Sequence, residues 1–261
     1  MRHLGAGSVK KGSPVDLGLA GRTAIVCGAS TGIGLAIAEA LADEGANVTM
    51  FARRRDVLER EAERIGALAV RGDVRSPRDL ENLVARTLQA FGGIDILVNN
   101  SGGPPRGTAR DAPADAVEAA VELLLVSVVR LTHLCLPHLE RSGRGRVITI
   151  TSSSVREPID GLVLSNAVRP GVVGWSKTLA REVAPLGITV NAVAPGRIDT
   201  ERVREVYPEG PTPADLAAIP TGRLGTTREV ADVVCFLASE RAAYVTGALV
   251  PVDGGLTRGL L

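Results

Sequence analysis

Short apolar runs alternate with longer amphipathic stretches along most of the chain. An apolar run of about four to eight residues between turn signals is typical of a buried strand, whereas apolar residues at every third or fourth position are typical of a helix. The apolar runs predict strands at residues 24–27, 47–51, 68–70, 95–98, 146–151, 188–194 and 248–252.

The stretches between the strands predict helices, and local signals mark several of their ends. Ser76 before Pro77 gives an N-cap followed by proline at the first helical position, and Thr226 with Glu229 gives a capping box. Pro170 lies inside one periodic stretch, so we expect that helix either to begin late, with Pro170 in its first turn, or to be kinked. The predicted helices span residues 35–42, 56–65, 77–90, 114–140, 167–184 and 227–239.

The regular alternation of strands and helices predicts one α/β domain, with a doubly wound parallel sheet of about seven strands and helices on both faces. We assign this domain to residues 17–261 and expect residues 1–16 to form a disordered tail. Ligands of such sheets bind beyond the carboxyl ends of the strands. The loops expected at that edge are 28–34, 73–74, 99–102, 152–165 and 195–200.

Composition narrows the possible functions. Hydrophobic residues make up 45% of the chain but aromatic residues only 2%, so aliphatic side chains must fill the core. The formal net charge of +1 argues against nucleic-acid or membrane-surface binding, and no apolar run is expected to cross a membrane. Cys27, Cys135 and Cys235 lie in apolar segments at wide spacing, which predicts buried free thiols in a reducing cytoplasm and no metal site.

A glycine-rich turn joins the first predicted strand to the first predicted helix. Gly28, Gly32 and Gly34 follow the apolar run 24–27, and the helix begins directly after them. Glycine lets the backbone approach a phosphate closely, and the free N–H groups of a helix start favour an anion. The spacing differs from the Gly-x-Gly-x-x-Gly dinucleotide fingerprint, so a turn without a ligand is the alternative interpretation.

Five motifs follow one another along the chain. They are Gly28-x-x-x-Gly32-x-Gly34, Asp73-Val74, Asn99-Asn100-Ser101-Gly102, Asn191-Ala192-Val193-Ala194-Pro195-Gly196, and Tyr244-Val245-Thr246-Gly247 with Val252-Asp253-Gly254-Gly255. In this order they resemble the short-chain dehydrogenase/reductase family, with similarity to 3-oxoacyl-acyl carrier protein reductases, from Leu19 to Leu256. This resemblance implies a Rossmann-like fold, a nicotinamide dinucleotide in the crevice, a small-molecule substrate, a cytoplasmic location and a homotetramer, with a dimer as the fallback.

The end of the second strand selects the cofactor in this family. A carboxylate there binds the ribose hydroxyls and repels a 2′-phosphate, whereas arginine attracts it. Here Ala52 takes the place of the acid and Arg53-Arg54-Arg55 follow, which favours NADP(H), although a solvated basic run is the alternative. The cofactor-binding residues implied by the resemblance are Gly28, Ser30, Thr31, Gly32, Ile33, Gly34, Arg53, Arg54, Asp73, Val74, Asn99, Ser101, Gly102, Arg169, Pro195, Gly196, Ile198 and Thr200.

The resemblance weakens at the catalytic positions, where the family uses Ser, Tyr, Lys and Asn. Ungapped alignment on residues 179–182 places Ser152 at the Ser position, Ser165 at the Tyr position and Arg169 at the Lys position. Alignment on Leu136-Pro137 places Leu124 at the Asn position. Serine is a far weaker acid than tyrosine, so the usual proton donor is missing and we expect little or no activity on the usual carbonyl substrates of the family.

Two interpretations from different classes remain. The favoured one is an NADP(H)-dependent oxidoreductase acting on a carbonyl or alcohol, whose non-standard proton donor is a water relay or an unrecognised group. The alternative is a nucleotide-binding homologue without redox turnover, serving as a sensor, an assembly partner, a lyase or an isomerase. Glu157, Asp160 and Tyr207 are weaker candidates for the replacement acid, and the segment 201–220 carries no readable chemistry.

Overall fold

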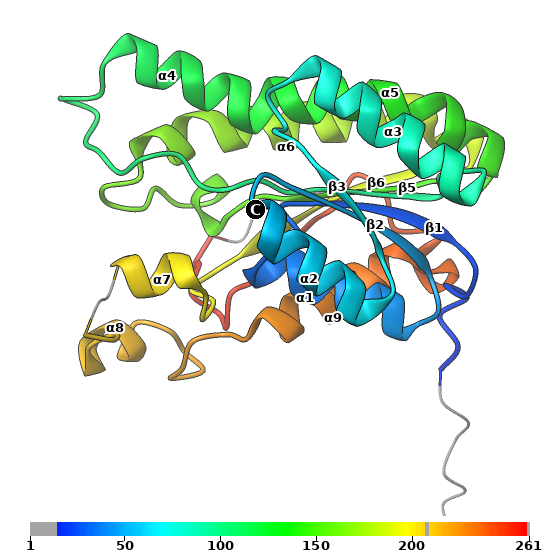
Figure 1. Cartoon of the computed structure of the whole chain (residues 1–261). Helices are drawn as coiled ribbons and strands as arrows, with labels where there is room; N and C mark the ends of the chain where they lie inside the picture. The colour runs from blue at the N-terminus through cyan, green and yellow to red at the C-terminus, as the bar shows by residue number, and fades with distance from the viewer. Residues whose placement is uncertain (1–14, 207–208, 260–261) are drawn as a thin grey trace, which may run out of the picture.

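The structure, a computed structural model, describes residues 15–206 and 209–259. Within these residues, seven parallel strands form one sheet in the order β3-β2-β1-β4-β5-β6-β7, and helices cover both of its faces (Figure 1). This confirms the predicted α/β doubly wound sheet. The strands are β1 (Thr23–Cys27), β2 (Asn47–Ala52), β3 (Leu68–Arg71), β4 (Ile96–Asn99), β5 (Arg146–Ile150), β6 (Thr189–Pro195) and β7 (Leu249–Val252).

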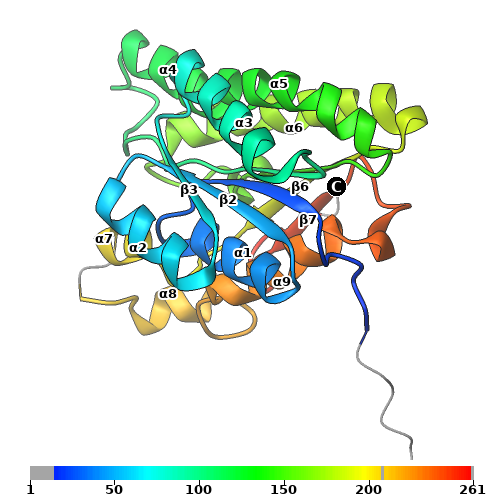
Figure 2. The same ribbon diagram turned by 45° about the vertical axis from the view of Figure 1, so that its right-hand side comes forward.

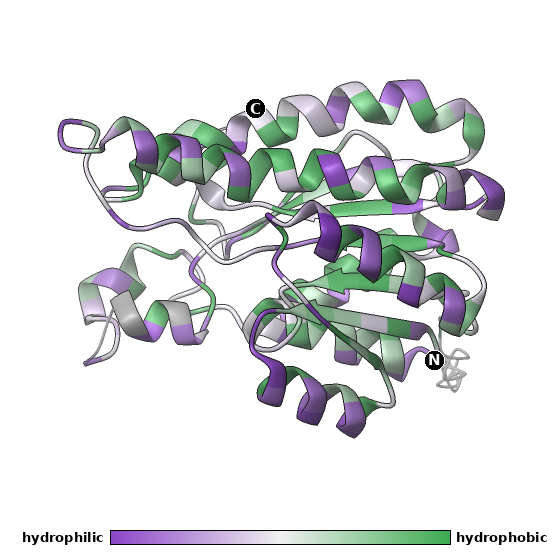
Figure 3. Cartoon of the chain, turned by 45° about the horizontal axis from the view of Figure 1, so that its top comes forward, coloured by the Kyte–Doolittle hydropathy of each residue, from purple (hydrophilic) through white to green (hydrophobic). Residues whose placement is uncertain are grey.

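Two aliphatic cores lie on the two faces of the sheet. One packs β1, β2 and β5 against α1, α2 and α9, and the other packs β1, β4 and β5 against α3, α5 and α6 (Figure 2). Apolar residues follow the strands and the inward sides of the helices, while polar residues lie outward (Figure 3). The longer helices are α1 (Gly32–Asp43), α2 (Arg55–Ile65), α3 (Pro77–Phe91), α5 (Ser127–Ser142), α6 (Val163–Val183) and α9 (Thr227–Ala238).

Both predicted helix caps are confirmed. Ser76 Oγ accepts the N–H of Asp79 at 3.3 Å at the start of α3. Thr226 Oγ1 accepts the N–H of Glu229 at 3.2 Å, and Glu229 Oε2 accepts the N–H of Thr226 at 2.7 Å. The predicted burial of the three cysteines as free thiols is also confirmed, and burial raises the pKa of the Cys27 thiol to about 12.

The two helices nearest the predicted crevice differ from the prediction. The run predicted at 114–140 consists of α4 (Ala114–Val121), a π-helical segment η1 (Glu122–Val126) and α5, in direct succession. The helix α6 begins at Val163, so Pro170 lies in its interior, and of the two alternatives expected for this helix the late start is wrong. Proline there removes the backbone hydrogen bond to the carbonyl of Asn166, which the surrounding packing must tolerate.

Two further differences concern segments without a clear periodic signal. The segment 201–220 contains two short helices, α7 (Glu201–Val206) and α8 (Pro213–Ala217), which the sequence did not predict. The continuous helical stretch Ala114–Ser142 is long and apolar enough to cross a membrane, contrary to expectation. It packs against α3, α6 and the sheet, as the core helix of a globular domain does.

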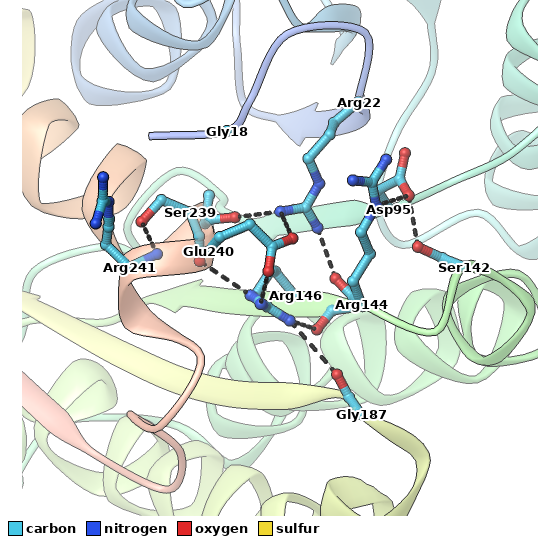
Figure 4. Close-up of polar contacts among 12 residues, drawn as sticks. Gly18, Arg22, Asp95, Ser142, Arg144, Arg146, Gly187, Ser239, Glu240 and Arg241 are labelled. Atoms are coloured by element: carbon cyan, nitrogen blue, oxygen red, sulfur yellow. Dashed lines mark hydrogen bonds and ion pairs between the residues drawn. The ribbon is translucent and has the colours of Figure 1, made fainter. Parts of the chain in front are cut away.

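Two buried arginines, one directly before β1 and one at the start of β5, hydrogen-bond to the chain at the end of α9 (Figure 4). Arg22 donates to the carbonyls of Ala238 at 2.8 Å and Arg144 at 2.6 Å, and Arg146 donates to the carbonyl of Ser239 at 3.3 Å. Glu240 lies 3.6 Å from Arg22 and 3.7 Å from Arg146. Burial, followed by repulsion from Arg146, lowers the pKa of Arg22 to about 10, which leaves its guanidinium charged at neutral pH. Burial also lowers the pKa of Arg146.

Candidate active site

The glycine-rich turn between β1 and α1 leaves free N–H groups at a helix start. Gly28 and Gly32 have φ values of +60° and +59°, which only glycine adopts readily. A Cβ atom on Gly34 would lie 2.2 Å from the carbonyl oxygen of Gly28, so this position also requires glycine. Thr31 makes no side-chain cap to α1. The turn therefore fits a phosphate in the place of a side-chain cap.

The arginines after β2 lie beside this turn. Arg54 Nη2 donates to Thr31 Oγ1 at 2.8 Å and lies 3.4 Å from Glu201 Oε2 at the start of α7. The exposed Arg53 has no side-chain hydrogen bond or ion pair among the described residues; its carbonyl accepts from Arg71. Arg53 is thus the guanidinium available to an anionic ligand at the end of β2.

The loop after β6 closes on the glycine-rich turn. A Cβ atom on Gly32 would lie 3.6 Å from the side chain of Thr200, and Ile198 is buried and paired with Gly225. Pro195 ends β6 beside Val252, and a Cβ atom on Gly196 would lie 2.7 Å from Asp253. The structure therefore brings the predicted residues of this loop to the same edge as the phosphate turn.

Several predicted cofactor-binding residues already have partners within the chain. Asp73 accepts two side-chain hydrogen bonds from Arg75, and these bonds hold the pKa of the Asp73 carboxyl below its usual range. The buried Asn99 donates through Nδ2 to Thr132 Oγ1 at 3.1 Å. Val74, Asn99 and Ser101 line one small cavity, whereas Gly102 is exposed, and Ser30 and Ile33 lie on the glycine-rich turn.

Two buried serines and one half-buried arginine form a network at the carboxyl end of β5. Ser165 Oγ lies 3.0 Å from Ser154 Oγ and accepts a hydrogen bond from Arg169 Nε at 3.1 Å. Arg169 Nη1 donates to the carbonyl of Ile150 at 3.1 Å. The predicted helical spacing of Ser165 and Arg169 on one face is confirmed, because α6 presents both side chains to this network.

Arg169 is a cation without a counter-charge. Among residues 15–206 and 209–259, no carboxylate pairs with it, and Nη2 makes no hydrogen bond. Desolvation by burial lowers the pKa of Arg169 to about 10, which still leaves the guanidinium charged at neutral pH. An unpaired positive charge in a region of low dielectric strongly stabilises negative charge nearby.

A small cavity adjoins this network. It has a volume of about 20 Å³, enough for one water molecule, and Arg169, Leu124 and Thr149 are among its lining residues. The buried Thr149 Oγ1 has no hydrogen-bond partner in the described structure. Ser127 on α5, whose Oγ donates to the carbonyl of Leu123, also lines the cavity. Residues that carry hydroxyl and guanidinium groups therefore line a space that can hold one water molecule.

The sequence identified part of this network and missed the rest. Ser152 Oγ accepts the N–H of Ser154 at 3.1 Å and makes no hydrogen bond to Ser165 in the described structure. Ser154, in the turn η2 (Ser153–Val155), is the serine that contacts Ser165, and the run of three serines did not reveal which one would. Tyr207 lies outside the described residues. Within these residues, no cluster of His, Cys, Asp or Glu gathers to hold a metal ion.

Known proteins resemble this chain over almost its whole length. A family model described as enoyl-(acyl carrier protein) reductase matches residues 28–257. The 3-oxoacyl-[acyl-carrier-protein] reductase FabG of Vibrio cholerae is 38% identical over 242 residues, covering 92% of this chain and 99% of the relative. Nodulation protein G of Rhizobium sp. is 41% identical over 244 residues, covering 91% and 98%.

Two solved structures share the fold closely. YwfH, an NADPH-dependent reductase involved in bacilysin biosynthesis, gives a TM-score of 0.87 at 28% identity, covering 92% of this chain and 99% of that one. L-Sorbose reductase from Gluconobacter frateurii, complexed with NADPH and L-sorbose, gives a TM-score of 0.86 at 32% identity, covering 94% and 100%. Each comparison covers more than nine tenths of this chain, so the similarity extends over almost the whole fold.

Proposed function

The chain belongs to the short-chain dehydrogenase/reductase family, and from this membership we propose that it is an NADP(H)-dependent oxidoreductase that interconverts a carbonyl and an alcohol on a small molecule. The observation that carries the proposal is the Ser154–Ser165–Arg169 network beside a phosphate turn at one edge of the sheet. The relatives described as NADPH-dependent reductases favour this function over nucleotide binding without redox turnover.

The geometry supports a proposed set of residues that would hold the cofactor. The turn Gly28–Gly34 and the start of α1 would hold the pyrophosphate, and the free guanidinium of Arg53 would hold the 2′-phosphate. Arg169 would contact the nicotinamide ribose through Nη2, and the loop Pro195–Thr200 would contact the nicotinamide. When bound, NADPH would supply the hydride that reduces the carbonyl carbon.

The carbonyl oxygen also needs a proton, which this chain delivers without tyrosine. We infer that Ser165 and Arg169 occupy the positions of the family's Tyr and Lys. Ser165 is only 5% exposed and Ser154 only 4%, so neither hydroxyl faces open solvent. They orient Arg169, while Arg169 and Thr149 hold a water in the adjoining cavity. This water gives one proton to the substrate oxygen and takes a replacement proton from bulk solvent, while the charge of Arg169 stabilises the developing oxyanion.

Replacing Thr149 with valine tests this water site. The substitution removes the unpartnered hydroxyl and keeps the shape, so we expect kcat to fall about tenfold, within the usual range of acid–base catalysis, with unchanged NADPH affinity. Steady-state kinetics and a calorimetric titration measure both. Thr189→Val is the matched control, because Thr189 Oγ1 on β6 is also buried and unpartnered but does not line the cavity. Equal losses in both variants, or none in Thr149→Val, would contradict the water site.

The proposed enzyme acts as a cytoplasmic homotetramer, with a dimer as the fallback. Large apolar side chains are exposed on α4 and around α9: Val117 is 38% exposed, Phe236 42% and Tyr244 fully exposed. These two regions lie on opposite faces of the sheet (Figure 1). Exposed apolar side chains on both faces leave room for two separate contacts between subunits, which is what a tetramer with several symmetry axes requires.

A further inference from the structure

The last described segment of the chain, residues 253–259, connects the stretch between α8 and α9 with the loop after β5. It follows β7 and is folded back on itself by Asp253, which accepts hydrogen bonds from the N–H of Gly255 at 2.9 Å and from Thr257 N at 3.0 Å and Oγ1 at 2.7 Å. The N–H of Thr221, between α8 and α9, donates to the carbonyl of Gly254 at 3.2 Å. This segment, hereafter the C-terminal strap, is therefore fixed at its start.

The far end of the C-terminal strap is held by the loop after β5. Glu157 Oε1 accepts the N–H of Arg258 at 2.5 Å and the N–H of Gly259 at 3.0 Å. The neighbouring Arg156 donates through Nη1 to the carbonyl of Gly259 at 3.2 Å. The carboxylate of Glu157 thus binds two backbone N–H groups of the C-terminal strap, and the neighbouring guanidinium of Arg156 binds one of its carbonyls. Hydrogen bonds to an ionised carboxylate are stronger than those between neutral groups.

Glu157, which holds the C-terminal strap, is hydrogen-bonded through its backbone to the turn η2 that carries Ser154. The N–H groups of Arg156 and Glu157 both donate to the carbonyl of Ser153, at 3.0 and 3.3 Å. Ser154 in turn contacts Ser165, which receives the hydrogen bond from Arg169. A shift of the loop at Glu157 therefore displaces Ser154 relative to α6.

We propose that Glu157 is a positioning residue, which uses the C-terminal strap to hold the 152–157 loop so that Ser154 stays in contact with Ser165. The inference rests on the proposed reductase function. Because a misplacement of about 1 Å at a catalytic site costs up to a hundredfold in rate, loss of this anchor lowers kcat. The glycine-rich turn and Arg53 lie on other loops, so NADPH binding is unaffected.

The test compares Glu157→Ala and Glu157→Gln with the unmutated protein. We expect Glu157→Ala to lower kcat about tenfold with little change in KM and in NADPH affinity, while Glu157→Gln, which keeps an acceptor oxygen, retains most of the activity. Asp160→Ala is the control, because this exposed carboxylate on the same loop has no side-chain partner in the described structure. An unchanged kcat in Glu157→Ala, or an equal loss in Asp160→Ala, would overturn the proposal.

Two further measurements separate this inference from the reductase function. Trypsin cleaves after Arg258, whose N–H is bound by Glu157, so intact-mass spectrometry should show faster loss of residues 259–261 in Glu157→Ala, and equal rates would refute docking of the strap. This result needs no activity, so it stands even if the protein reduces no carbonyl. Deleting residues 258–261 should lower kcat as Glu157→Ala does, and combining both changes should add nothing; additive losses would contradict a shared contact.

Discussion

Arg169→Met should lower kcat at least about a hundredfold, a change of about 2.7 kcal/mol in the activation free energy. Methionine removes the hydrogen bonds to Ser165 Oγ and to the carbonyl of Ile150, together with the charge that lines the cavity. It also removes the proposed contact with the nicotinamide ribose, so NADPH affinity should fall as well. Steady-state kinetics and calorimetric titration of the variant measure the two effects.

Arg181→Met is the control for this substitution. Arg181 lies in the last turn of α6, is exposed, and makes no side-chain hydrogen bond or ion pair in the described structure. The control should match the unmutated protein in kcat and NADPH affinity. If Arg169→Met also matched it, Arg169 would be a structural residue, and the proposed proton route would be wrong.

Arg53→Ala should weaken NADPH binding at least about tenfold and leave NADH binding almost unchanged. A hydrogen bond to a charged group contributes about 1.5–3 kcal/mol, and the 2′-phosphate is present only in NADPH. The guanidinium of Arg53 makes no hydrogen bond or ion pair in the described structure, whereas Arg54 binds Thr31 and Glu201. The unmutated protein should therefore prefer NADPH over NADH in a direct titration.

The neighbouring Arg55 supplies the control for the cofactor experiment. Arg55 belongs to the same basic run but lies in α2, where its Nε is 3.8 Å from Glu59 Oε1. Arg55→Ala should weaken NADPH far less than Arg53→Ala does, because only the long-range attraction changes. Equal losses for NADPH and NADH in Arg53→Ala would show that this side chain does not recognise the 2′-phosphate.

The fold was predictable from the sequence because its signals are local. Buried parallel strands are continuous apolar runs, and caps such as Ser76 are set by neighbouring residues, so all seven strands and both caps could be predicted. The start of α6 could not be predicted in this way, because packing keeps Pro170 inside a helix that local propensity would break. The burial of Arg22 and Arg146 was equally hidden, because it depends on carbonyls distant in the chain.

The candidate site was predictable only where residue spacing decides it. Ser165 and Arg169 are four apart in a helix, so their contact follows from helical geometry. The choice of Ser154 over Ser152 depends on the geometry of the turn η2, which no residue spacing specifies. The cavity at Thr149 is lined by residues of several strands, loops and helices that are distant in the sequence, so only the packed structure reveals that this hydroxyl has no partner.

The most direct test of the central claim is the consumption of NADPH by the unmutated protein, followed through the absorbance of the reduced nicotinamide. The carbonyl panel should include a 3-oxoacyl thioester and a ketose, the substrate classes named for two of its relatives. We expect NADPH to be oxidised in proportion to at least one carbonyl compound, with the alcohol as product, and Arg169→Met to abolish this turnover. Tight NADPH binding without oxidation by any carbonyl in the panel would contradict the claim.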